Sequence, residues 1–152
     1  MAVNMVKNMM LVLVLASGYF VVACGQQEEE KFDLELSKKK WNSAGITWNE
    51  ADLRRLHNGE KLYRKKCSVC HKGDGRGDTA LRAPALYSNP IVNDQKSVLI
   101  QRILGGKIGT AMPAFAGVLT DEEIAQLATY LRNAWGNHAS DSVTATEVEK
   151  LR

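Results

Sequence analysis

The chain has 152 residues, of which 45% are hydrophobic and 24% are charged, and its net charge at pH 7 is +3. This length and composition predict one globular domain. A charge of this size is too small to indicate nucleic acid as a partner, and the sequence has no glycine-rich phosphate loop before a helix and no dense basic stretch interleaved with aromatic residues.

The first 23 residues have the pattern of an export signal. Lys7 precedes an apolar run over residues 9–23, with no acidic residue before it. The run ends in Val-Val-Ala-Cys at residues 21–24, which resembles the lipobox of bacterial lipoproteins and implies cleavage before Cys24 and lipid on its thiol. Two alternatives are a plain secretory signal and an uncleaved membrane helix, although the run is shorter than the roughly 18 residues that a span needs. We expect residues 1–23 to be a lipoprotein signal peptide.

The next segment, residues 24–46, is polar and charged and has no sustained apolar period. This composition predicts a lipid-anchored tether rather than part of a packed core. Its few apolar side chains could instead pack onto the domain, and the sequence leaves the choice open for Phe32, Leu34, Leu36 and Trp41. The domain itself is expected to occupy residues 47–152.

This domain is predicted to be all-α, because its apolar residues recur at three- and four-residue steps and no strand pattern appears. Four helices are expected, over residues 47–67, 94–104, 120–135 and 144–151. The expected starts are capping boxes at Thr47 and Thr120 and an asparagine cap at Asn93. Glycines at 105, 106 and 136 are expected to end two of these helices.

The sequence Cys-Ser-Val-Cys-His at residues 67–71 is the signature of covalent haem attachment. The thiols of Cys67 and Cys70 add to two vinyl groups, and His71 then directs its ring at the iron. A structural zinc site would need a second cysteine pair, which the chain lacks. A thioredoxin-like dithiol would need a βαβ context. With lipid on Cys24, none of the three cysteines is left over, and we predict one haem c.

A sixth iron ligand is predicted at Met112. Four of the five methionines lie in the signal, so Met112 is the only thioether of the mature chain. It lies in a glycine-bounded loop, and Pro113 biases it toward an extended backbone that can present sulfur to the metal. A lone methionine is more often core filler. The rival ligands are His57, on the first helix, and His138, in a loop, and we rank both below Met112.

Other residues are expected to support the ligands. A metal-bound histidine usually donates its second N–H to a carbonyl or carboxylate, and the carbonyl of Pro84 is the candidate acceptor for His71. Pro84 is equally compatible with a simple turn. Leu86 and Phe115 are expected to line the haem, or else to be ordinary core residues.

Taken together, these motifs resemble class I c-type cytochromes. The segments that carry the resemblance are residues 59–63, 67–71, 84–86, 112–115 and 119–137. The resemblance implies a small all-α fold around one covalent haem c, with His71 and Met112 as axial ligands. It also implies that the first and last helices cross through a contact of Gly59 and Tyr63 with Tyr130 or Leu127.

The closing stretch, residues 131–152, is similar to single-haem domains that accompany copper nitrite reductases, quinohaem dehydrogenases and terminal oxidases. The implied function is electron transfer between redox proteins on the outer face of a bacterial membrane, with no small-molecule substrate and no catalysis. The alternative is a peroxidase or gas sensor in which Met112 is labile. Residues 52–82 carry nine basic and four acidic side chains, which suggests steering toward an acidic partner.

Overall fold

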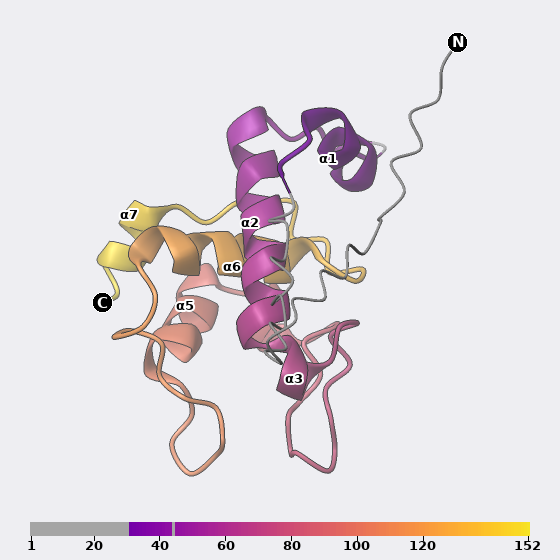
Figure 1. Cartoon of the computed structure of the whole chain (residues 1–152). Coiled ribbons are helices and arrows are strands. Elements are labelled where there is room, and N and C mark those ends of the chain that lie inside the picture. The colour runs from indigo at the N-terminus through magenta and orange to yellow at the C-terminus, as the bar shows by residue number, and fades with distance from the viewer. Residues whose placement is uncertain (1–30, 44) are drawn as a thin grey trace, which may run out of the picture. The chain divides into compact units, whose positions relative to one another are not determined.

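The computed structural model describes residues 31–43 and 45–152 (Figure 1). Within these ranges the chain forms helices only, and the backbone pairing outside them is limited to two isolated bridges, Ser43 with Ile46 and Asp78 with Ala83. The predicted all-α class is therefore confirmed. The helices are α1 (Leu34–Trp41), α2 (Glu50–Lys66), α3 (Ser68–His71), α4 (Pro90–Asn93), α5 (Lys96–Gly105), α6 (Asp121–Asn133) and α7 (Ala145–Glu149).

The centre of the fold is the crossing of α2 and α6 (Figure 1). Gly59 makes this crossing possible, because a Cβ atom at that position would lie 2.1 Å from the carbonyl oxygen of Gln126 and 2.8 Å from Cβ of Tyr130. One turn further along α2, the ring of Tyr63 lies 5.5 Å from the ring of Tyr130. The glycine–aromatic crossing expected from the sequence is thus present.

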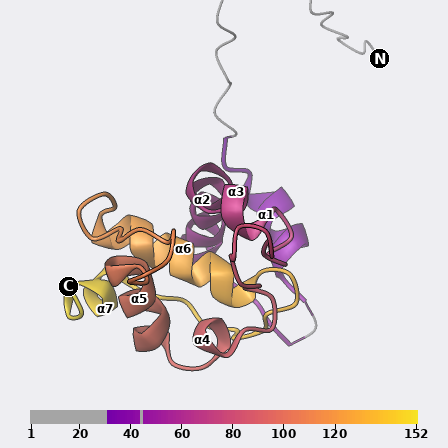
Figure 2. The ribbon, with the colours of Figure 1, turned by 90° about the horizontal axis from the view of Figure 1, so that it is seen from below.

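Helices α5 and α7 cover the remaining apolar stripe of α6, as Figure 2 shows. Most of the buried side chains of these three helices are aliphatic, and they include Leu99, Ile100, Ile103, Ile124, Leu127, Leu131 and Val148. Burying each such side chain contributes roughly 1.5 to 3 kcal/mol. Helix α7 has only five residues, so it depends on this docking for its stability.

Two helix starts differ from the prediction. Helix α2 begins at Glu50 and is capped by Asn49, whose side-chain oxygen accepts the backbone N–H of Asp52 at 2.9 Å. The expected cap at Thr47 is therefore wrong by two residues, because asparagine is at least as good a cap as threonine and lies next to the helix. The predicted capping box at Thr120 is confirmed, with both of its hydrogen bonds formed.

The segment before α5 is also more structured than predicted. A separate short helix, α4, begins at Pro90 with Asn89 as its cap, and Asn93 is its last residue. Helix α5 starts at Lys96 after Gln95, so the prediction that Asn93 caps it is wrong. Proline at a first helical position favours a new helix start there. The chain therefore forms a short helix from Pro90, and the next helix begins two residues later than predicted.

Much of the predicted tether belongs to the folded unit. The compact unit begins at Lys31, and α1 lies against α2. The ring of Phe32 packs edge-on against His57 at 5.5 Å, and the guanidinium of Arg54 lies 4.3 Å from the same ring. The ring of Trp41 lies 5.9 Å from that of Tyr130. Phe32 and Trp41 therefore pack onto the domain, as the alternative reading allowed, whereas Leu36 is 65% exposed.

The predicted signal peptide and Cys24 lie outside the described residues. In the part of the chain that the structure describes, no helix is long and apolar enough to cross a bilayer.

Candidate functional site

A cavity of about 530 Å³ lies beside the α2–α6 crossing and collects most of the predicted site residues. Its walls are largely apolar. The residues predicted from the sequence that line it are Cys67, Cys70, His71, Pro84, Leu86, Met112 and Phe115. The remaining wall includes Val92, Leu99, Ile103, Leu127 and Leu131 from the core. A volume of this size is within the range of small-molecule and cofactor sites.

The two thiols come from the junction of α2 and α3. Cys67 ends α2 and precedes α3, and the backbone N–H of His71 donates to the carbonyl of Cys67 at 2.9 Å. Both cysteines are half-buried and not joined as a disulfide. Burial, and next the nearby Cys70, raise the pKa of Cys67 to about 11. A redox-active dithiol has a lowered thiol pKa, so this environment argues against the dithiol alternative.

The imidazole of His71 is held by the chain itself. Its Nδ1 atom lies 2.9 Å from the carbonyl oxygen of Pro84. A carbonyl only accepts, so Nδ1 carries the proton and Nε2 keeps its lone pair. This is the tautomer that a metal-binding histidine needs.

The loop between His71 and Pro84 is built around Gly77. A Cβ atom at Gly77 would lie 2.4 Å from the carbonyl oxygen of Ala83 and 2.6 Å from the carbonyl carbon of Pro84. The backbone has a positive φ of 77° there, so glycine is required on both counts. Lys72 pairs with Asp78 at 2.5 Å across the base of the loop, and that hydrogen bond lowers the pKa of Asp78.

Asn137 connects the segment after Pro84 to the end of α6, and the sequence analysis gave it no role. Its side chain is 1% exposed. Its amide donates to the carbonyls of Leu86 at 3.1 Å and Leu131 at 2.8 Å, while its oxygen accepts the backbone N–H of Ser88 at 2.9 Å and the amide of Asn93 at 3.1 Å. Asn137 therefore fixes the chain just beyond Pro84.

Met112 lies on a strap, residues 106–119, on the cavity wall. Its carbonyl accepts the backbone N–H of Lys107 at 3.2 Å. A Cβ atom at Gly106 would lie 2.7 Å from the carbonyl oxygen of Met112, so the strap folds closely on its own start. At its far end Arg152 donates to the carbonyls of Ala116 and Leu119.

The rival ligands lie elsewhere. His57 is on α2 against Phe32, and His138 is exposed in the loop after α6. Neither lines the 530 Å³ cavity. In the described part of the chain, no group of three or more His, Cys, Asp and Glu side chains could hold a metal ion.

The charged side chains on the cavity wall are all basic. They are Lys66, Arg82, Arg102 and Lys107, and no aspartate or glutamate among the described residues lines the wall. Two thiols, one imidazole of fixed tautomer and one thioether face an apolar space with a positive rim. This donor set fits one haem joined through two thioether bonds, and it defines a small helical haem-binding domain.

Comparison with known proteins agrees with this class. Residues 54–131 match the family model described as "Cytochrome C oxidase, cbb3-type, subunit III". Cytochrome c6 of Parathermosynechococcus lividus is 37% identical over 79 residues, which are 50% of this chain and 86% of that protein. The chain belongs to the cytochrome c family, whose members carry covalently bound haem c.

Other relatives are longer proteins. The cytochrome c subunit of alcohol dehydrogenase (quinone) from Gluconobacter oxydans (strain 621H) is 34% identical over 104 residues, or 62% of this chain. The gluconate 2-dehydrogenase cytochrome c subunit of Pantoea cypripedii is 32% identical over the same length. The matches span only 22% and 24% of those two subunits. Among solved structures, cytochrome cL of Methylophaga aminisulfidivorans matches with a TM-score of 0.47 and 24% identity, covering 90% of this chain and 89% of that one.

Proposed function

We propose that this protein is a one-electron carrier in which His71 and Met112 are the two axial ligands and Cys67 and Cys70 hold the haem. When bound, haem c supplies a reversible one-electron couple. The contact between His71 and the Pro84 carbonyl is the observation that carries the proposal, because it fixes the ligating tautomer of a histidine on the same cavity wall as Met112.

Each residue has a distinct task in this proposal. The Pro84 carbonyl orients His71 and makes it a better donor. The strap holds Met112 against the cavity, and its thioether favours the reduced form and raises the potential. Apolar residues such as Leu86 and Phe115 exclude water. His71 and Met112 would both bind the iron and leave it no site for a substrate, so the protein would be a carrier rather than an enzyme.

The test is the absorption spectrum of the matured protein, oxidised and reduced, with and without CO. We expect a weak long-wavelength band in the oxidised protein and no CO shift. Met112→Ala removes the band and admits CO. Ile108→Ala is the matched control, because Ile108 lies on the same strap and is fully exposed.

The second candidate function is a peroxidase or gas sensor with a labile Met112. It would be favoured if the unmodified protein lacked the band and bound CO rapidly. The half-buried position of Met112 and the backbone contacts of its strap support the carrier instead.

We propose that partners meet the basic rim of the cavity. A positive rim accelerates association with an acidic surface, and salt screens the effect. Ferricyanide, an anionic oxidant, should therefore oxidise the reduced protein more slowly at high salt and more slowly in Lys107→Glu. Lys150→Glu is the control, because Lys150 is exposed and does not line the cavity. Equal rates in both variants would contradict the proposal.

The proposed location is the outer face of a bacterial membrane, with lipid on Cys24, and the proposed partners are respiratory redox proteins such as a dehydrogenase, reductase or oxidase. Similarity to dehydrogenase cytochrome c subunits supports this class of partner. Cys24→Ser should release the protein from the membrane fraction while the haem spectrum stays unchanged. Retention in the membrane would contradict lipid anchoring.

A further inference from the structure

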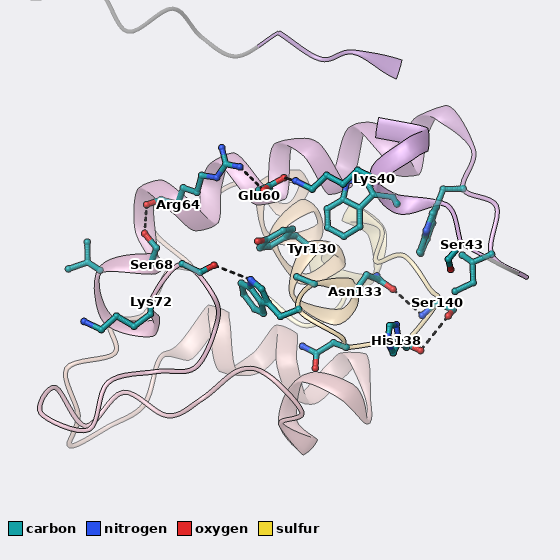
Figure 3. Close-up of a pocket in the computed structure, with 18 residues that line it drawn as sticks. Lys40, Ser43, Glu60, Arg64, Ser68, Lys72, Tyr130, Asn133, His138 and Ser140 are labelled. Carbon is teal, nitrogen blue, oxygen red and sulfur yellow. Dashed lines mark hydrogen bonds and ion pairs between the residues drawn. The ribbon is translucent and has the colours of Figure 1, made fainter. Parts of the chain in front are cut away.

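A second hollow lies beside α3 and shares no residue with the haem cavity. This aromatic groove has a volume of about 780 Å³ and is formed by α1 and the segment after it, by α2 and α3, and by the end of α6 with the loop that follows (Figure 3). All three tryptophans of the chain line it, together with Tyr130. The residues so placed are Trp41, Trp48 and Trp135.

Several hydrogen-bond donors open into the aromatic groove without an acceptor among the described residues. Among the described residues, the indole N–H groups of Trp41 and Trp48 donate to nothing, whereas that of Trp135 donates to the carbonyl of Gly73 at 3.0 Å. Tyr130 is 5% exposed, and its hydroxyl, which is not among the buried unpaired atoms of the described residues, is open to the groove. Figure 3 shows this hydroxyl pointing toward the side of the groove formed by Ser68 and Lys72. Burial, and next Glu60, raise the pKa of Tyr130, so the hydroxyl stays a donor.

The charge of the aromatic groove is mostly positive. Among the described residues, Lys40, Arg64 and Lys72 line it with one carboxylate, Glu60. Glu60 pairs with both Lys40 and Arg64, and Lys72 pairs with Asp78, which does not line the groove. An occupant therefore needs acceptors and negative charge rather than donors.

The residues that line the aromatic groove favour one mode of peptide binding over the others. The described residues have no strand whose edge could add a further strand. Aromatic faces with unpaired N–H and O–H donors between them are the means by which proteins bind polyproline II segments, whose carbonyls point outward and whose proline rings lie flat on the aromatic rings.

We propose that the aromatic groove binds an extended, proline-containing acidic segment of a partner protein. Ser68 and Val69 of α3 face this groove, while Cys70 and His71 of the same helix face the haem cavity. A partner held here leaves the mouth of the haem cavity open. This binding does not depend on the proposed electron transfer, and the two can fail separately.

The test uses the acetylated and amidated heptapeptide Glu-Pro-Pro-Glu-Pro-Pro-Glu, titrated into the reduced holoprotein. The readout is the set of three indole N–H signals in a proton–nitrogen NMR spectrum. We expect the signals of Trp41 and Trp48 to shift and saturate, and that of Trp135, which already has an acceptor, to shift less. Raising the salt concentration should weaken binding.

Two variants and two peptides make the test specific. Tyr130→Phe removes only the hydroxyl and should weaken binding about fivefold, which corresponds to one net hydrogen bond. Tyr87→Phe is the control, because Tyr87 is 40% exposed and lies outside the groove. Replacing glutamate by lysine, or proline by alanine, in the peptide should each weaken binding at least tenfold.

Three results would overturn the proposal. The first is no indole shift at millimolar peptide. The second is equal binding of the lysine peptide or the alanine peptide. The third is indole signals that depend on protein concentration without peptide, together with a dimer in ultracentrifugation, because the occupant would then be a second copy of this chain.

Discussion

Replacing Asn137 by alanine should loosen the loop that orients His71. The side chain makes four hydrogen bonds and is 1% exposed. At a net contribution of roughly 1 kcal/mol each, their loss lowers the free energy of unfolding by about 4 kcal/mol. The groups left without partners include the carbonyl of Leu86 and the N–H of Ser88, so the damage is concentrated next to Pro84.

The assay is denaturant unfolding of the holoprotein followed by circular dichroism, with amide hydrogen exchange as a local measurement. The amides of Leu86 and Ser88 should exchange much faster in Asn137→Ala, while amides in the middle of α2 change less. Asn58→Ala is the matched control, since Asn58 is exposed on α2. A loss of stability no larger than that of Asn58→Ala would refute the assigned role.

Three further changes test other parts of the fold. Gly59→Ala should prevent the close approach of α2 and α6 and lower the unfolding free energy by at least about 3 kcal/mol, because its Cβ would lie 2.1 Å from the Gln126 carbonyl oxygen; unchanged thermal unfolding would contradict this. Asp78→Asn should destabilise the protein at neutral pH. The Lys72 hydrogen bond lowers the pKa of Asp78 in the folded protein. The difference in unfolding free energy between Asp78→Asn and the unmodified protein is therefore largest above the unfolded pKa of about 3.9, and it disappears as the pH falls through the lowered folded pKa. A pH-independent difference would argue against the pair. Trp41→Ala should detach α1 from Tyr130 and make α1 sensitive to protease, with little change in the haem spectrum.

The candidate haem-attaching and iron-binding residues could be named from the sequence because their chemistry is local or compositional. The attachment motif is five consecutive residues, and Met112 is the only methionine among the described residues. The crossing of α2 and α6 could also be predicted, because the resemblance to class I c-type cytochromes implies a contact of Gly59 and Tyr63 with the last helix.

The supporting contacts could not be predicted in the same way. Asn137 and Ser88 are 49 residues apart in the sequence. A single asparagine in a loop does not indicate which distant groups its side chain will hydrogen-bond. The α1 segment is mostly polar and lacks a sustained apolar period, so its packing depends on single rings such as Phe32 and Trp41 rather than on a stripe. The aromatic groove could not be predicted from the sequence either, because its three tryptophans come from separate segments of the chain.

The contacts that hold His71 come from nearby residues of the chain, whereas those that hold the strap of Met112 come from a distant one. The His71 side is closed within a short loop by Pro84 and Gly77, whereas the end of the strap depends on Arg152, 36 residues beyond Ala116. Native-state openings are cooperative in units, and a helix of five residues that is stable only when docked opens at low cost. We therefore expect α7 to undock first and, if Met112 is the ligand that we propose, to free its thioether while His71 stays in place. Ligand exchange at the metal would then report the fluctuation of the last helix, with a CO-binding rate that rises in Arg152→Ala and follows the hydrogen exchange of α7.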